Sequence, residues 1–201
     1  TGALVGRELR AVGVNLLLGP NLDVLDQALP ATVGSMGVFS FGGNPYWVSQ
    51  MARAYVTGVH AGGEGRIATF VRHFPGQGNI DRLPEEEVAT IQKSADELRA
   101  VTLPPFLAVT APAPGTGPEG QAALPSPITD GIIVSNMQFS ALQVTDSQGT
   151  PLGLDPDLPS IVGDAGLAEW RAAGGLLMSG PLGVPAVRKY YDPAQADKLC
   201  D

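Results

Sequence analysis

The chain has 201 residues, of which 44% are hydrophobic and 16% are charged, and its formal net charge at pH 7 is −8. This length and composition predict one globular domain, or part of one, over residues 1–201. The acidic balance argues against nucleic acid or an acidic membrane surface as a partner. No apolar run approaches the roughly 18 residues needed to span a bilayer. Cys200, the single cysteine, excludes an internal disulfide.

The first half of the chain alternates helical patterns with short apolar runs. A helix is predicted over about residues 4–12, followed by a strand over 14–18. Pro45, behind a capping asparagine, predicts the start of a second helix that ends at the glycine pair 62–63. A second strand is predicted over 67–71. The abrupt helical start suggests that the chain begins inside a larger architecture.

The second half repeats this arrangement twice. A third helix is predicted around residues 95–106, despite two prolines near its end. The Pro/Gly/Ala-rich stretch at about 111–127 is interpreted as an exposed insertion. A strand over 131–136 follows, then a long irregular segment, a helix over 167–171 and a strand over 176–179.

Near-continuous apolar strands that alternate with amphipathic helices predict an α/β fold with a parallel sheet covered by helices. Four such units are about half of a (β/α)8 TIM-type barrel, whose usual length is about 250 residues. Half a barrel has two unpaired strand edges, so we expect a partner polypeptide or further chain to complete it. An open doubly wound sheet is the alternative, but residues 19–23 lack its glycine-rich phosphate loop.

The most informative segment is residues 72–78, Arg-His-Phe-Pro-Gly-Gln-Gly, which follows a predicted strand directly. The carboxyl ends of barrel strands carry the chemistry in such folds. This segment resembles the Lys-His-Phe-Pro-Gly-His-Gly signature of glycoside hydrolase family 3, the β-glucosidases and β-N-acetylhexosaminidases. Four further segments resemble that family in the same order: 6–24, 40–45, 103–106 and 175–182.

The resemblance implies a TIM-type barrel and retaining hydrolysis of β-linked sugars, which requires a carboxylate nucleophile and a nearby proton donor. The family's nucleophilic aspartate matches Gly180, which has no side chain with which to attack. The family's donor histidine has no counterpart in the short loop 79–84. The sugar-gripping arginine matches Phe39, and the second signature histidine matches Gln77.

The residues that the resemblance leaves for ligand binding are Asp23, Arg72, His73 and Gln77. Each has a structural interpretation as well. Asp23 can cap the loop that follows it, His73 can be hydrogen-bonded within its own loop, and Arg72 can pair with Asp23 across neighbouring strand ends. Asp81 is a further candidate for a catalytic acid.

Several other residues are interpreted as structural. Trp47 and Trp170 lie on predicted apolar helix faces, which favours core packing over sugar stacking. His60 is favourable to the negative end of its helix, and residues 84–87, Pro-Glu-Glu-Glu, are typical of the first turn of a solvated helix. No cluster has metal-ligand spacing, so neither a metal nor a cofactor is expected.

The sequence therefore predicts a family 3-like barrel that has lost hydrolytic activity and serves as a structural, assembly or carbohydrate-binding module. The alternative is an active retaining β-glycosidase that takes its carboxylates from elsewhere, such as Asp81 or Glu85. We expect an extracellular or cell-envelope location, with a cytoplasmic one as the alternative.

Overall fold

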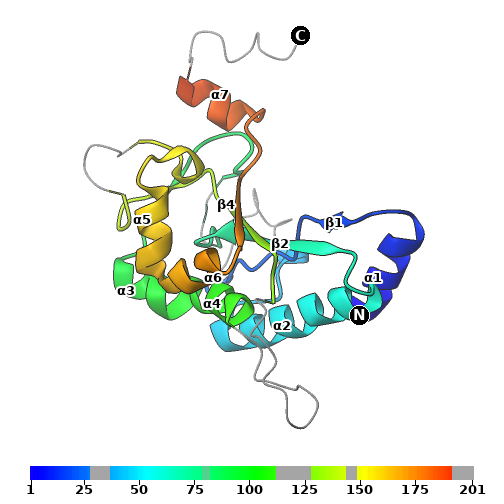
Figure 1. Ribbon diagram of the computed structural model, residues 1–201. Coiled ribbons are helices and arrows are strands. Elements are labelled where there is room, and N and C mark those ends of the chain that lie inside the picture. Colours follow the sequence, from blue (N-terminus) through cyan, green and yellow to red (C-terminus); the bar gives the residue numbers. More distant parts are fainter. Residues whose placement is uncertain (28–36, 79, 81, 112–127, 144–148, 192–201) are drawn as a thin grey trace.

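The structure is a computed structural model that describes residues 1–27, 37–78, 80, 82–111, 128–143 and 149–191 (Figure 1). Most of the predicted insertion at 111–127, together with Asp81, lies outside the described residues. The helices are α1 (Gly2–Ala11), α2 (Pro45–Gly62), α3 (Ala95–Glu97), α4 (Pro104–Thr110), α5 (Leu158–Val162), α6 (Ala168–Ala172) and α7 (Pro185–Tyr191). The strands are β1 (Leu16–Leu17), β2 (Ala68–Phe74), β3 (Thr90–Ile91), β4 (Gly131–Val134), β5 (Gln138–Phe139) and β6 (Leu176–Ser179).

The central feature is a four-stranded parallel sheet in the order β1-β2-β4-β6. Its strands follow chain order without the reversal that defines a doubly wound sheet. This order excludes the alternative and confirms the predicted α/β class: the sheet is half of a TIM-type barrel. A second small parallel sheet pairs β3 with β5, and the sequence did not predict it.

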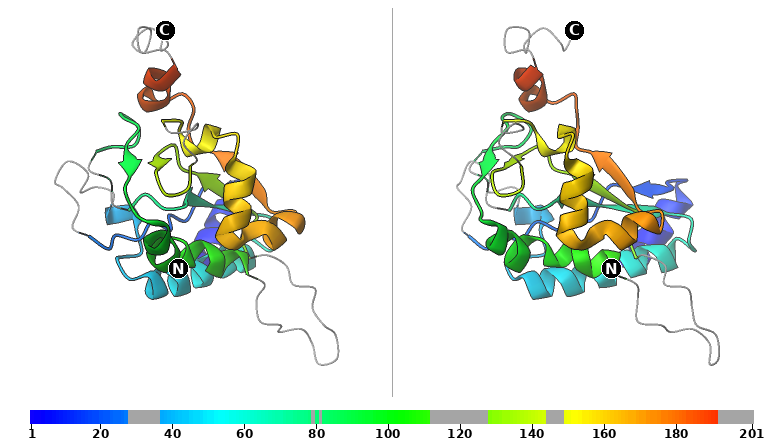
Figure 2. Two further views of the ribbon diagram at one scale, coloured as in Figure 1. Left: turned by 90° about the vertical axis from the view of Figure 1, so that its left-hand side faces the viewer. Right: turned by 60° about the vertical axis from the view of Figure 1, so that its left-hand side comes forward.

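Helices α1, α2 and α4 pack side by side along the sheet, as Figures 1 and 2 show. The contact between α1 and α2 is close because glycines line it. A Cβ atom at Gly6 would collide with the carbonyl group of Val59, and one at Gly62 would collide with that of Ala3. Only residues without a side chain allow the two backbones to approach this far.

Helix α2 begins as predicted. The Asn44 side chain accepts a hydrogen bond from the Trp47 amide at 3.2 Å, and Pro45 occupies the first turn. The helix buries a different face from the one predicted, however. Val48 and Val56 lie in the core, whereas Trp47 is 61% exposed. The prediction of core packing is thus wrong for Trp47. Both stripes of this helix are apolar, so spacing alone could not choose between them.

Trp170, by contrast, is only 4% exposed, which confirms its predicted place in the core. Strand β6 has the bounds that the sequence predicts. The third predicted helix is interrupted: a π-helical turn at Leu98–Thr102 separates α3 from α4, which begins at Pro104. Proline cannot donate the backbone hydrogen bond that a continuous helix would need.

Two further predictions need correction. Residues 84–87 form a turn rather than the start of a helix, with the amides of Glu86 and Glu87 both donating to the Leu83 carbonyl. The segment predicted to be irregular contains helix α5 and a 3-10 turn at Leu152–Leu154. Prolines and glycines break the apolar periodicity of this segment, which hid the helix.

The outer strands of the sheet are β1 and β6. On these strands or directly after them lie apolar side chains that are exposed in the described structure, namely Leu16, Leu18 and Leu176. In a closed barrel such side chains would lie against neighbouring strands and helices.

Candidate functional site

A pocket of about 250 Å³ opens at the carboxyl ends of strands β2, β4 and β6. We call it the strand-end pocket. Its walls are formed by Leu18, Arg72, His73, Gln77, Pro84, Glu85, Ile133, Asn136, Met178, Ser179, Gly180, Pro181 and Val184. The carboxyl ends of the strands are where barrel proteins bind and transform ligands. Three of the four predicted ligand residues (Arg72, His73 and Gln77), and Gly180 as well, therefore lie together in the place that the fold favours.

Asp23 stands behind this wall and does not line the pocket. It is 1% exposed, and its two carboxylate oxygens have different partners. Oδ2 lies 2.9 Å from His73 Nδ1, and Oδ1 accepts a hydrogen bond from the Gln77 amide at 2.9 Å. Asp23 thus holds the signature loop, residues 72–78, to the segment that follows β1. Its role is structural, but the described partners of its carboxylate lie in the signature loop and not in the loop after Asp23, which it was expected to cap.

His73 gains its orientation from this contact. His73 lines the pocket, and because its Nδ1 contacts the carboxylate of Asp23, the ring nitrogen left for a ligand is Nε2. Within the described residues no protein group pairs with Nε2. His73 is thus held as a rigid hydrogen-bonding group at the pocket wall.

Gln77 links the signature loop to the end of β4. Its Oε1 accepts a hydrogen bond from Ser135 Oγ at 2.8 Å, and that hydroxyl oxygen in turn accepts one from the Met137 amide at 3.0 Å. The side chain is almost fully buried. Its carboxamide oxygen is therefore already used within the protein, and Gln77 acts first on loop geometry.

Arg72 differs from Asp23, His73 and Gln77, whose side chains all have hydrogen-bond partners within the protein. Its backbone is paired with Pro20 and Leu22, but its side-chain Nε is buried without a hydrogen-bond partner. Among the described residues it also forms no ion pair. The predicted pairing with Asp23 is therefore wrong, because His73 and Gln77 occupy that carboxylate.

Gly180 lies at the tip of β6, against the side chain of Asn136 from the end of β4. A Cβ atom at Gly180 would lie 2.9 Å from Asn136 Nδ2 and 3.0 Å from its Oδ1. The carboxamide thus fills the volume into which a side chain at position 180 would extend. Asn136 Nδ2 donates to the Pro181 carbonyl at 2.8 Å, whereas Oδ1 is buried without a partner.

Sequence reasoning did not single out Asn136. The signal was present, because a polar residue closes the apolar strand predicted over 131–136, at the barrel end that carries the chemistry. Its significance depends on the neighbour across the sheet. The structure shows that neighbour to be Gly180, whose backbone lies against the Asn136 carboxamide.

Acidic groups are scarce around the pocket. Among the described residues that line it, Glu85 is the only one with a carboxylate. The structure tests no role for Asp81, which lies outside the described residues. No group of three His, Cys, Asp or Glu side chains suited to a metal ion occurs in the described part of the chain.

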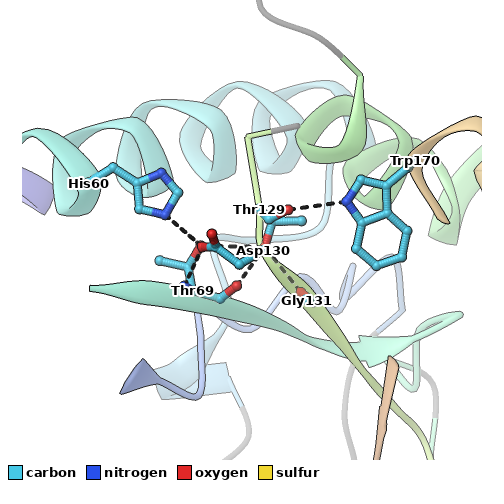
Figure 3. A network of polar contacts seen from close by, with 6 residues as sticks. All are labelled: His60, Thr69, Thr129, Asp130, Gly131 and Trp170. Carbon is cyan, nitrogen blue, oxygen red and sulfur yellow. Dashed lines mark hydrogen bonds and ion pairs between the residues drawn. The ribbon is translucent and has the colours of Figure 1, made fainter. Parts of the chain in front are cut away.

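A second polar cluster lies at the opposite end of the sheet, where β2 and β4 begin (Figure 3). We call it the amino-end network; its members are His60, Thr69, Thr129, Asp130 and Trp170. Asp130 Oδ2 lies 3.0 Å from His60 Nε2 and accepts a hydrogen bond from the Thr69 amide at 2.8 Å. Trp170 Nε1 donates to the Thr129 carbonyl at 3.1 Å.

The electrostatics of this network centre on Asp130. Burial alone would raise the pKa of this carboxyl group, but the hydrogen bonds from His60 and Thr69 and the charge of His60 outweigh it. The pKa of Asp130 is therefore below its ordinary value. His60, which was interpreted as a partner of the helix terminus, instead joins α2 to the sheet through Asp130.

A parallel half-barrel with a pocket at its strand ends defines the class of the protein as a TIM-type barrel. Residues 1–114 match the model of the glycosyl hydrolase family 3 N terminal domain, which is more than half of the chain. The chain belongs to glycoside hydrolase family 3. The resemblance inferred from the signature loop is thereby confirmed.

Curated relatives agree with this assignment. The chain is 35% identical to a β-hexosaminidase of Pseudomonas aeruginosa over 105 residues, which are 52% of this chain and 30% of that protein. It is 35% identical to a β-hexosaminidase of Methylococcus capsulatus over 113 residues, 54% of this chain and 30% of the relative. The match spans under a third of these relatives.

Solved structures show the same fold. A family 3 β-N-acetylglucosaminidase from Paenibacillus superposes with a TM-score of 0.73 at 22% identity, covering 98% of this chain and 32% of that one. A β-N-acetylhexosaminidase from Beutenbergia cavernae gives a TM-score of 0.67 at 18% identity, covering 98% of this chain and 58% of its own. At these identities the likeness concerns the fold alone.

Proposed function

We propose that this chain forms half of a family 3 barrel that binds carbohydrate in the strand-end pocket without hydrolysing it. One observation carries the proposal. The position that the family resemblance assigns to the nucleophile is Gly180, and the carboxamide of Asn136 occupies the space in front of it.

The chemistry of retaining hydrolysis supports this reading. It requires two carboxyl groups about 5 Å apart, or a carboxylate and another proton donor, at the bond to be cleaved. The described walls of the pocket supply one carboxylate, that of Glu85. Losing the nucleophile and the donor removes at least about 10²-fold in rate for each role.

The groups that remain suit binding. His73 Nε2, the Ser179 hydroxyl group and the guanidinium of Arg72 can hydrogen-bond to ligand hydroxyls, while Ile133, Met178 and others provide apolar walls. Small-molecule sites typically combine a few fixed polar groups with such apolar surface. A sugar ring, with hydroxyls at its edge and C–H groups on its faces, matches this combination.

The test combines turnover with binding. Chromogenic β-glucosides and β-N-acetylglucosaminides should show no hydrolysis above background, while calorimetry or ligand-observed NMR should detect saccharide binding. His73→Gln should weaken binding about tenfold, because it removes one oriented hydrogen bond. His60→Gln, at the other end of the sheet, is the matched control and should leave affinity unchanged. Stoichiometric hydrolysis that a single carboxylate substitution abolishes would overturn the proposal.

A second candidate function is an active glycosidase, and the place of Glu85 favours it. Glu85 lines the pocket, and its carbonyl group accepts a hydrogen bond from the Ala186 amide at 3.0 Å, which anchors its turn to α7. In that case Glu85→Gln should abolish turnover and leave saccharide binding intact. The neighbouring Glu86→Gln, outside the pocket wall, should leave both turnover and saccharide binding unchanged.

The partner and the location stay predictions. The exposed apolar edges β1 and β6 support completion of the barrel by further chain or by a partner polypeptide, which the mass of the intact particle would test. Fractionation of the source organism would test the extracellular or cell-envelope location. None of the helices in the described ranges is both long and apolar enough to cross a membrane.

A further inference from the structure

The charge of Arg72 is not balanced by any residue that the structure describes. Some other basic side chains have anionic partners: Lys93 lies 2.7 Å from Asp26, and Arg10 pairs with Glu64. Arg72 has none among the described residues, although it is only partly exposed and its Nε is closed to solvent. A partly buried cation without a counter-ion costs free energy that an anionic ligand would recover.

No acid at the described pocket wall pairs with Arg72. Asp23, at the neighbouring strand end, is engaged by His73 and Gln77. Gly180 has no side chain, and Glu85 forms no ion pair with Arg72 in the described structure. Arg72 therefore lines a pocket in which no described carboxylate pairs with it.

A second, independent observation concerns Asn136. It is 7% exposed, and its Oδ1 is a buried acceptor without a hydrogen-bond donor. Buried polar atoms in folded proteins nearly always have partners, so such an atom at a pocket wall indicates a group that arrives with a ligand. The group that satisfies Oδ1 is a hydroxyl or N–H donor.

Arg72 and Asn136 require complementary groups on a ligand. The guanidinium of Arg72 requires an anionic acceptor, and guanidinium binds carboxylate or phosphate through two parallel hydrogen bonds. Asn136 Oδ1 requires a donor on the same molecule. We infer that the strand-end pocket selects a hydroxylated anion, a sugar that carries a carboxylate or phosphate group, over the neutral sugar. This inference rests on the proposed binding function and narrows its ligand class.

The experiment compares ligands that differ in charge but share a ring. Calorimetry or NMR titration of the whole chain with glucuronate, glucose 6-phosphate and glucose should show at least about tenfold tighter binding of one acid than of glucose. The stronger arm identifies the source of the charge as carboxylate or phosphate. Raising the salt concentration should weaken binding of the acidic sugar and leave binding of glucose unchanged.

Matched variants assign the preference to Arg72. Arg72→Gln should lower the affinity for the acidic sugar to the affinity for glucose. Arg72→Lys should retain part of the preference, because lysine keeps the positive charge but lacks the planar guanidinium that forms two parallel hydrogen bonds. Arg66→Gln, an exposed arginine just before the opposite end of β2, changes the net charge equally and should leave the preference intact. Circular dichroism confirms folding of each variant.

The outcomes separate the inference from the proposed function. Equal binding of glucose and both acids would overturn the inference and leave carbohydrate binding standing. Binding of inorganic phosphate as tight as that of glucose 6-phosphate would overturn the requirement for a hydroxylated ligand. If no saccharide binds, neutral or acidic, both the inference and the proposed function fail.

Discussion

Polar side chains at the two ends of the sheet differ in whether their hydrogen bonds are satisfied. At the amino ends of β2 and β4, the amino-end network pairs its carboxylate, imidazole, hydroxyl and indole groups with one another and with the backbone. At the carboxyl ends, Arg72 Nε and Asn136 Oδ1 are the two buried side-chain atoms without partners in the described part of the chain. Both residues line the strand-end pocket.

This difference separates stability from binding. In barrels the amino-terminal face serves stability and the carboxyl-terminal face serves ligands. A satisfied network lowers the free energy of the folded state, whereas unsatisfied groups raise it until a ligand arrives. Substitutions in the satisfied network and substitutions of the two residues with unpartnered atoms should therefore change stability with opposite signs.

The largest effect is expected for Trp170→Ala. This substitution leaves a cavity in the core and removes the hydrogen bond to the Thr129 carbonyl, which should cost about 4 kcal/mol of unfolding free energy. Urea denaturation measures the loss. Trp47→Ala is the matched control, and because Trp47 is mostly exposed its change should stay within about 0.5 kcal/mol. Equal losses for both tryptophans would contradict the assignment of the buried face.

Asp23→Asn should have the next largest effect. It replaces a carboxylate that accepts two hydrogen bonds in a buried position, which should destabilise the protein by about 2 kcal/mol. Saccharide affinity should fall as well, because His73 loses its anchor. Denaturation and calorimetry on the same samples check both effects. Unchanged affinity would show that His73 does not depend on Asp23 for its orientation.

Arg72→Met tests whether removing an unpartnered group at the carboxyl ends of the strands raises the free energy of unfolding. Removing an unpaired, partly buried charge while keeping an apolar stem of similar length should stabilise the free protein by about 1 kcal/mol. The same substitution should abolish the preference for acidic saccharides. A rise in melting temperature together with a loss of binding is the expected result. A destabilised variant would indicate that Arg72 is satisfied within the protein.

The smallest effect concerns the pH dependence of the amino-end network. Since the pKa of Asp130 is lowered in the folded state, its contribution is present above the unfolded pKa of about 4 and is lost as the pH falls through the folded value. The side chain is 44% exposed, so Asp130→Asn should cost less than about 1 kcal/mol at pH 6. Denaturation at pH 6 and pH 3 should show the two proteins converging at the lower pH.

Local signals made much of the fold predictable. An asparagine cap followed by Pro45 located the start of α2, and glycines on either side located β6. The sequence could not show which of the two apolar stripes of α2 faces the core, because this depends on where α1 and α4 pack. The half-barrel followed from the count and order of apolar strands.

The site was predictable only in part. The signature loop located Arg72, His73 and Gln77 at the pocket, because strand ends of a parallel sheet converge. The pairing of Asp23 with His73 rather than with Arg72 depends on side-chain directions that spacing does not encode. Asn136 could be recognised only from the structure, which places its carboxamide against Gly180.

The contact between Gly180 and Asn136 also bears on any attempt to introduce a carboxylate at the tip of β6. In Gly180→Asp the new Cβ would lie 2.9 Å from Asn136 Nδ2, so the carboxamide would have to shift. Because Nδ2 donates to the Pro181 carbonyl at 2.8 Å, this shift would disturb that hydrogen bond. An engineered carboxylate at position 180 is therefore best combined with a smaller residue at position 136.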